Sequence, residues 1–194
     1  MTNPIDQSAQ RAVEGDTERD QVAPANDNAP EPERWPHQLW LDMDGVLADF
    51  DSAASKALRT DNSYKWEWLH GSKAFWDTLN QNPNFFGDLP PMVDCLVLFD
   101  KVEHLRPIIL TALPKVGAEE VDAQKRAWVA KYLGEDVRVV TCQTHEKPDY
   151  CGLGDVLVDD RSVNKARWEA EGGRYVIHTS ANDSIRQLRE MGVI

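Results

Sequence analysis

The amino-acid sequence predicts an α/β fold, in which a parallel sheet is covered by helices on both faces. From Gln38 onward, short apolar runs alternate with segments of helical periodicity. Strands that alternate with helices are joined by right-handed crossovers, and the resulting parallel sheet buries both of its faces. The first crossover is much longer than the others, which predicts a small helical insertion after the first strand.

Five apolar runs of strand length are the candidate strands of this sheet: 38–42, 107–111, 137–141, 155–159 and 174–178. A helix is predicted over residues 118–133, where Val121, Trp128 and Val129 recur at helical spacing, and Gly134 is predicted to end it. A second helix is predicted over residues 163–171, before a pair of glycines.

The insertion lies between the first two strands and is rich in aromatic residues. Helical signals at residues 52–59 and 66–69 are followed by an Asn82-Pro83 break. We therefore expect residues 51–86 to form a mostly helical cap over the carboxyl ends of the strands.

The composition of the chain indicates its domain boundaries, its partners and its cellular location. Residues 1–34 are acidic and rich in proline, with almost no large apolar side chains, which predicts a disordered tail before a domain at 35–194. The net charge of −12, without a basic patch, argues against long nucleic acid as a partner. Three cysteines without a CxxC pair indicate reduced thiols, and no apolar stretch is long enough to span a membrane. A cytoplasmic protein is expected.

Polar residues that suit phosphate chemistry follow four of the predicted strands. Ligands of such sheets bind beyond the carboxyl ends of the strands. The set has the order Asp-x-Asp, Thr, Lys, Asp-Asp and consists of Asp42, Asp44, Thr111, Lys147, Asp159 and Asp160. Clustered carboxylates repel one another unless a cation joins them, and Mg²⁺ favours such oxygen ligands. Gly45 permits a tight turn whose backbone approaches a ligand closely.

Each of these residues has an ordinary structural explanation when it is taken alone. A single aspartate at a strand end often caps a helix or forms a turn, a threonine there is usually a turn residue, and a lone lysine is usually solvated. The prediction of a site rests on the conjunction, because all of them follow apolar strands in one order.

This order resembles that of the haloacid-dehalogenase (HAD) superfamily, and the resemblance covers residues 38–190. Within that superfamily, the segment 42–50 (DMDGVLADF) is similar to the first motif of the 5′(3′)-deoxyribonucleotidase family. The segments 85–92 (FFGDLPPM) and 159–161 (DDR) are also similar to members of that family. The resemblance implies a HAD-like Rossmannoid parallel sheet with a cap.

The resemblance also implies roles for the acidic residues. Asp42 is expected to be the nucleophile that attacks phosphorus, and Asp44 the general acid and base. A Mg²⁺ ion is expected to be bound by Asp42, by the backbone carbonyl of Asp44, and by Asp159 or Asp160. The sequence does not decide between the last two.

The phosphoryl oxygens are expected to contact Thr111, Lys147 and the loop at Gly45. One departure from the family pattern follows the threonine, where Ala112 stands in place of the serine of many relatives, so that one hydroxyl contact is missing. Phe50 and Trp76 are the candidates for contact with a nucleobase, although cap aromatics are also needed for packing.

The function that these patterns indicate is the hydrolysis of (deoxy)nucleoside monophosphates through a phosphoaspartate. A HAD phosphatase acting on a sugar phosphate, another small metabolite or a nucleic-acid end is the nearest alternative. A non-catalytic binding module on the same scaffold is a further one. The expected partner is a small phosphate monoester, and a homodimer is left open.

Overall fold

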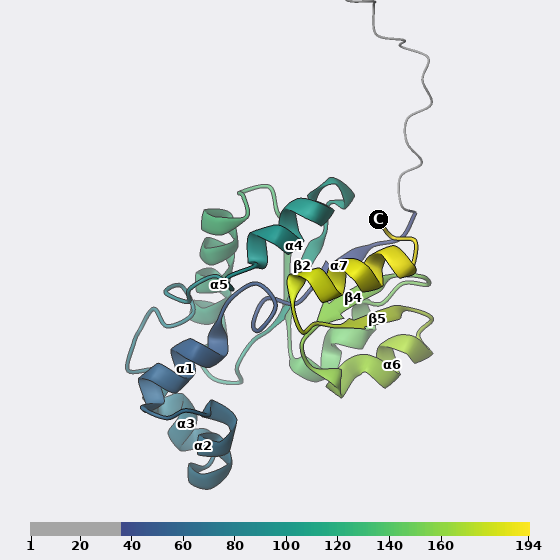
Figure 1. Cartoon of the computed structure of the whole chain (residues 1–194). Coiled ribbons are helices and arrows are strands. Elements are labelled where there is room, and N and C mark those ends of the chain that lie inside the picture. The colour runs from purple at the N-terminus through teal and green to yellow at the C-terminus, as the bar shows by residue number, and fades with distance from the viewer. Residues whose placement is uncertain (1–35) are drawn as a thin grey trace, which may run out of the picture. The chain divides into compact units, whose positions relative to one another are not determined.

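The computed structural model describes residues 36–194 (Figure 1). The acidic tail predicted for residues 1–34 lies outside the described residues. Among residues 36–194, no helix is both long enough and apolar enough to cross a bilayer.

The core of the fold is a five-stranded sheet in which every pairing is parallel, as predicted. Its strands, in the spatial order β3-β2-β1-β4-β5, are β3 (Val139–Cys142), β2 (Ile108–Ala112), β1 (Leu39–Leu41), β4 (Val156–Asp159) and β5 (Arg174–Ile177). Since β1 and β4 are adjacent, the residues that follow them meet at one edge of the sheet. The strand order therefore brings the first and last acidic pairs together.

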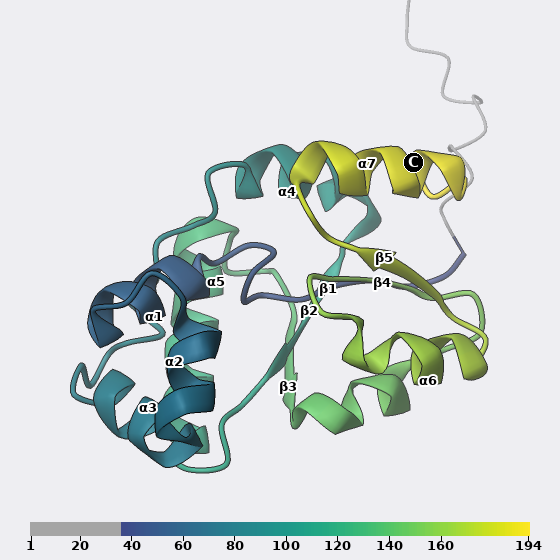
Figure 2. The same ribbon diagram turned by 60° about the horizontal axis from the view of Figure 1, so that its bottom comes forward.

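Helices cover both faces of this sheet (Figure 2). The helices α4 (Cys95–Val102), α5 (Ala118–Tyr132) and α7 (Ala181–Glu190) pack on one face, with Leu39 and Leu41 in the same core cluster. The helix α6 (Lys165–Ala170) packs on the other face, where Trp40 points. The alternation of these side chains along β1 is the normal alternation of a strand that is buried on both sides.

Three helices form the predicted insertion after β1, namely α1 (Phe50–Leu58), α2 (Ser63–His70) and α3 (Ser72–Leu79). The side chain of Asp49 accepts a hydrogen bond from the Ser52 backbone N–H at the start of α1, and Asn62 caps α2 in the same way. Aromatic rings of Phe50, Phe75 and Phe86 lie together between these helices and the segment that returns to the core.

Several elements were not predicted individually from the sequence: α3, α4, α7, and the short 3₁₀ helices η1 (Glu103–Leu105), η2 (Thr144–Tyr150) and η3 (Ser162–Asn164). The buried residues of α4 recur at helical spacing, but the exposed Leu96 and Val97 make the run 95–99 apolar throughout and mask that spacing in the sequence. Helix α7 does show a signal, because Ser180 caps it and its buried residues recur at helical spacing.

Candidate active site

The candidate site lies at the carboxyl ends of β1, β2 and β4, where a pocket opens between the sheet edge and the helical insertion. One half of the pocket is acidic and contains Asp42, Asp44, Asp159 and Asp160. The other half is aromatic and belongs mainly to the insertion. The position agrees with the rule that ligands of parallel sheets bind beyond the strand ends.

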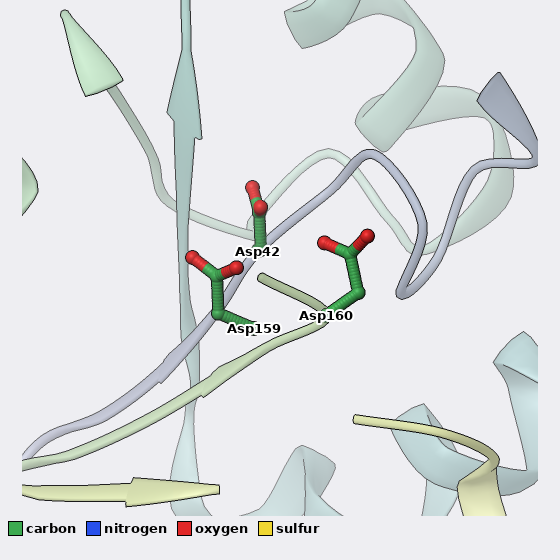
Figure 3. A group of neighbouring side chains, drawn as sticks. All are labelled: Asp42, Asp159 and Asp160. Atoms are coloured by element: carbon green, nitrogen blue, oxygen red, sulfur yellow. The ribbon is translucent and has the colours of Figure 1, made fainter. Parts of the chain in front are cut away.

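Three of the predicted acids form a cluster that could hold a metal ion. Asp42 follows β1, Asp159 ends β4 and Asp160 follows it, and one carboxylate oxygen of each lies within 4.8 Å of the other two. Figure 3 shows the three side chains pointing to the same side of the two chain segments. Burial and, to a smaller extent, the neighbouring Asp159 carboxylate together raise the pKa of Asp160 to about 6. Burial also raises the pKa of Asp42 well above its ordinary value, although Lys147 opposes this.

The donor set fits a hard divalent cation. All three groups offer carboxylate oxygens, which Mg²⁺ prefers, and few carboxylates leave room for water and a phosphate oxygen. The Oδ1 atom of Asp160 is buried and has no hydrogen-bond partner among residues 36–194. A buried acceptor without a partner costs free energy, which a cation would recover. By contrast, both oxygens of Asp159 have partners, the Arg161 N–H and the Lys147 ammonium.

Lys147 is the cation that lies within this acidic half. It belongs to η2, is 3% exposed, and its Nζ lies 2.7 Å from Asp42 Oδ2 and 2.8 Å from Asp159 Oδ2. Burial alone would lower the pKa of Lys147, but the two carboxylates raise it above its ordinary value. The side chain is therefore charged, and it bridges the ends of β1 and β4.

Gly45 is required by the geometry of the loop after β1. Its φ angle is +79°, in the left-handed region that disfavours other residues. A Cβ atom at this position would lie 2.5 Å from Asp160 Oδ2. The absence of a side chain therefore allows the loop to pack directly against the acidic cluster.

Asp44 is not part of the three-acid cluster, because its carboxylate is held by a lysine that was not predicted to belong to the site. Lys125, on α5, is fully buried, and its Nζ donates to Asp44 Oδ2 at 2.6 Å. The same ammonium donates to the Thr111 hydroxyl at 2.8 Å and to the Ala112 carbonyl at 2.9 Å. Asp44 Oδ1 is buried without a partner among the described residues.

Thr111 is fully buried next to this lysine and does not line the pocket, whereas Ala112 and Leu113 do. Its hydroxyl oxygen accepts the hydrogen bond from Lys125, so the hydroxyl hydrogen remains available as a donor. The threonine thus lies at the edge of the site, and the following residue, Ala112, lines the pocket in its place.

The aromatic half of the pocket contains both of the predicted base contacts, Phe50 and Trp76, together with Phe75 and Phe86. The rings of Phe50 and Trp76 lie 6.3 Å apart, and Trp76 stacks on Phe86 at 6.4 Å. Lys125 Nζ lies 4.9 Å from the centre of the Phe86 ring. This ring therefore connects the aromatic half of the pocket to the lysine that holds Asp44.

The polar residues of this half were not predicted. Asp51, Tyr64 and Glu67 line the pocket from α1 and α2, and Arg161 lines it from the loop after β4. Burial raises the pKa of the Asp51 carboxyl, against a hydrogen bond with Tyr64. Arg161 follows the predicted acidic pair directly, and Lys125 falls on the buried face of the predicted helix. These two positions, one next to the acidic pair and one on the buried face of the helix, are the features of the sequence that could have indicated Arg161 and Lys125.

The fold and the acidic, aromatic-lined site define a HAD-type phosphoric monoester hydrolase. A family model described as "5' nucleotidase, deoxy (Pyrimidine), cytosolic type C protein" matches residues 37–191. The chain belongs to this 5′-nucleotidase family and is an enzyme of that type.

Individual relatives agree with the family. A Bordetella pertussis protein named "Putative 5'(3')-deoxyribonucleotidase" is 28% identical over 140 residues, which is 64% of this chain and 74% of that protein. The human mitochondrial 5′(3′)-deoxyribonucleotidase is 23% identical over 171 residues, covering 78% of this chain and 74% of that protein. A solved hydrolase structure from Streptococcus pneumoniae has the same fold, with a TM-score of 0.52 and 15% identity over 81% of this chain and 98% of that one.

Proposed function

We propose that this enzyme hydrolyses (deoxy)nucleoside monophosphates through a covalent phosphoaspartate on Asp42, with Mg²⁺ bound at the acidic cluster. The observation that supports the substrate class is the continuity of the pocket, in which the carboxylates at the strand ends adjoin the aromatic side chains of the insertion. A phosphoryl group at the acidic end would leave a flat base beside Phe50 and Trp76, since aromatic faces stack well on bases.

In the first step, a carboxylate oxygen of Asp42 forms a bond to phosphorus as the ester P–O bond breaks. Asp44 donates a proton to the leaving sugar oxygen. In the second step, water attacks phosphorus, Asp44 takes its proton, and the bond to Asp42 breaks to release inorganic phosphate. Two such steps replace one difficult hydrolysis.

The other residues of the site would stabilise charge and geometry during these steps. Mg²⁺, when bound by Asp42, the Asp44 carbonyl and Asp159 or Asp160, would shield the anionic nucleophile from the anionic substrate. Lys147 would neutralise the phosphoryl oxygens.

The remaining polar contacts come from neighbouring loops. The Thr111 hydroxyl would donate a hydrogen bond to the phosphoryl group. The loop at Gly45 would approach that group closely with its backbone, although the Gly45 N–H itself donates to the Ala48 carbonyl at 2.9 Å. Lys125 would keep the Asp44 carboxylate directed at the leaving oxygen, because it binds Asp44 and Thr111 at once.

The test of this proposal is a phosphate-release assay with a panel of monoesters, including the four deoxynucleoside monophosphates, their ribose counterparts and several sugar phosphates. We expect the nucleotides to have higher kcat/KM values than the sugar phosphates. A sugar phosphate that outperforms every nucleotide would replace the proposed substrate class without changing the chemistry. Absence of turnover with all of them would contradict catalysis by this chain.

Removal of divalent cations is expected to abolish turnover. An excess of chelator should silence the enzyme, Mg²⁺ should restore it, and Ca²⁺ should do so poorly, since Ca²⁺ prefers longer bonds and more ligands. The measurement is the steady-state rate at a series of free Mg²⁺ concentrations. Full activity in excess chelator would refute the metal-dependent mechanism.

Phe50→Ala is expected to raise KM for nucleotides, because a stacking contact of about 1–3 kcal/mol would be lost. The variant should have a much smaller effect on p-nitrophenyl phosphate, which is too small to occupy the aromatic half. Phe85→Ala is the matched control, since Phe85 packs edge-on against Phe50 at 5.8 Å but does not line the pocket. Equal losses with both substrates for Phe50→Ala would mean that the ring only supports the fold.

A further inference from the structure

A buried tyrosine lies next to the acidic cluster and has no role in the mechanism proposed above. Tyr175, on β5, is 4% exposed. It is in register with Leu157 on the neighbouring strand, while Asp159 lies two residues further along β4. Since residues two apart share one face of a strand, the ring of Tyr175 and the side chain of Asp159 are on the same side of the sheet.

The tyrosine hydroxyl holds the turn that follows β4. It donates a hydrogen bond of 2.7 Å to the backbone carbonyl of Arg161. The backbone N–H of the same Arg161 donates to Asp159 Oδ1 at 2.8 Å. Both polar backbone groups of Arg161 are thus fixed, one by the strand end and one by β5, and Asp160 lies between the two fixed residues.

The orientation of Asp160 depends on this turn more than on contacts of its own side chain. Asp160 Oδ1 has no hydrogen-bond partner in the described part of the chain, and its carboxylate packs against the bare backbone of Gly45. The neighbouring carboxylates of Asp42 and Asp159 repel it, which favours rotation of the turn toward solvent. A fixed backbone opposes that rotation before any cation arrives.

The environment of Tyr175 keeps it a hydrogen-bond donor. Burial raises its pKa well above the ordinary value, and Asp159 and Asp42 raise it further.

We propose that Tyr175 is a positioning residue of the metal site, whose hydroxyl holds the Asp159–Arg161 turn so that the Asp160 carboxylate faces Asp42. The inference depends on the proposed function, because it requires a divalent cation to bind this cluster. Outer partners of this kind orient the ligands of a metal, and their loss typically weakens metal affinity by about 10- to 100-fold.

The experiment compares metal binding by the full-length wild-type chain and by Tyr175→Phe, which keeps the ring and removes only the hydroxyl. Mn²⁺ is titrated into each protein, and the EPR signal of the free ion gives the dissociation constant directly, without substrate or turnover. Competition with Mg²⁺ then gives the affinity for Mg²⁺. We expect Tyr175→Phe to bind both ions about tenfold more weakly. Its turnover should be low at limiting Mg²⁺ and recover at saturating Mg²⁺.

Tyr132→Phe is the matched control for the loss of a tyrosine hydroxyl. Tyr132 packs on Trp128 at the end of α5 and does not line the pocket. Its variant should bind Mn²⁺ like the wild type. Thermal unfolding of both variants separates positioning from stability, because a purely structural role for Tyr175 would lower Tm and leave the Mn²⁺ affinity unchanged.

The outcomes distinguish this inference from the function on which it depends. Equal Mn²⁺ affinities for wild type and Tyr175→Phe would overturn the role of Tyr175 and leave the proposed metal site intact. Failure of the wild type itself to bind Mn²⁺ or Mg²⁺ would overturn both. Weaker binding by Tyr175→Phe, with Tyr132→Phe unchanged, would establish the positioning role.

Discussion

Asp42→Asn is expected to reduce kcat by about 10⁴-fold or more, with little change in Tm, because removal of a nucleophile costs more than most other changes in an active site. The amide is nearly isosteric with the carboxylate but cannot form the bond to phosphorus. The amide oxygen of the asparagine can still accept the hydrogen bond that the Met43 N–H donates to Asp42 Oδ1 at 2.7 Å. It loses the ion pair with Lys147, but it also relieves the repulsion from Asp159 and Asp44, whose charges raise the pKa of Asp42.

A matched control is provided by another buried aspartate, outside the site. Asp155 accepts hydrogen bonds from the Gln38 N–H at 2.8 Å, the Trp40 indole at 3.0 Å and the Gly152 N–H at 3.0 Å, at the opposite end of β4 from the acidic cluster. Asp155→Asn should therefore lower Tm while leaving kcat close to that of the wild type. Near wild-type turnover by Asp42→Asn would refute the covalent mechanism, and a drop in Tm like that of Asp155→Asn would show that Asp42 also supports the fold.

The sheet could be predicted because its signal is local. Each strand is a short apolar run bounded by polar residues, and the structure differs from the prediction by at most two residues at the strand ends. The meeting of Asp42 with Asp159 and Asp160 could also be expected, because parallel strands place their carboxyl ends at one edge. This prediction required only the positions of the strand ends and no knowledge of contacts between side chains.

The residues of the site that were not predicted are placed there by contacts between different helices and strands. A lysine on a helix is usually solvated, and the place of Lys125 on the buried face of the predicted helix does not by itself indicate where its ammonium lies. Only the packing of α5 against β2 shows that its ammonium is buried between Asp44 and Thr111. The polar wall from Asp51 and Tyr64 depends on how α1 and α2 pack, and aromatic contacts without sequence periodicity determine that packing.

Asp44→Asn is expected to reduce kcat for nucleotides by about 10²- to 10⁴-fold, the usual contribution of a general acid or base. The two steps should respond differently when the leaving group is changed. A sugar alkoxide needs a proton in order to leave, whereas p-nitrophenolate does not. With p-nitrophenyl phosphate, the variant should therefore form the phosphoaspartate quickly and hydrolyse it slowly, because the second step still needs the base. Rapid mixing should show a burst of p-nitrophenolate close to one equivalent per enzyme.

Lys125→Met should give the same pattern with a smaller loss, since it leaves the Asp44 carboxylate in place but removes the ammonium 2.6 Å away. Lys131→Met is the control, because Lys131 is exposed on the same helix and contacts the Tyr132 ring instead. If Lys125 directs Asp44 at the leaving oxygen, the loss caused by Lys125→Met will be larger for nucleotides than for p-nitrophenyl phosphate. Equal losses for the two substrates, without a burst in Asp44→Asn, would mean that this pair supports the loop after β1 and transfers no proton.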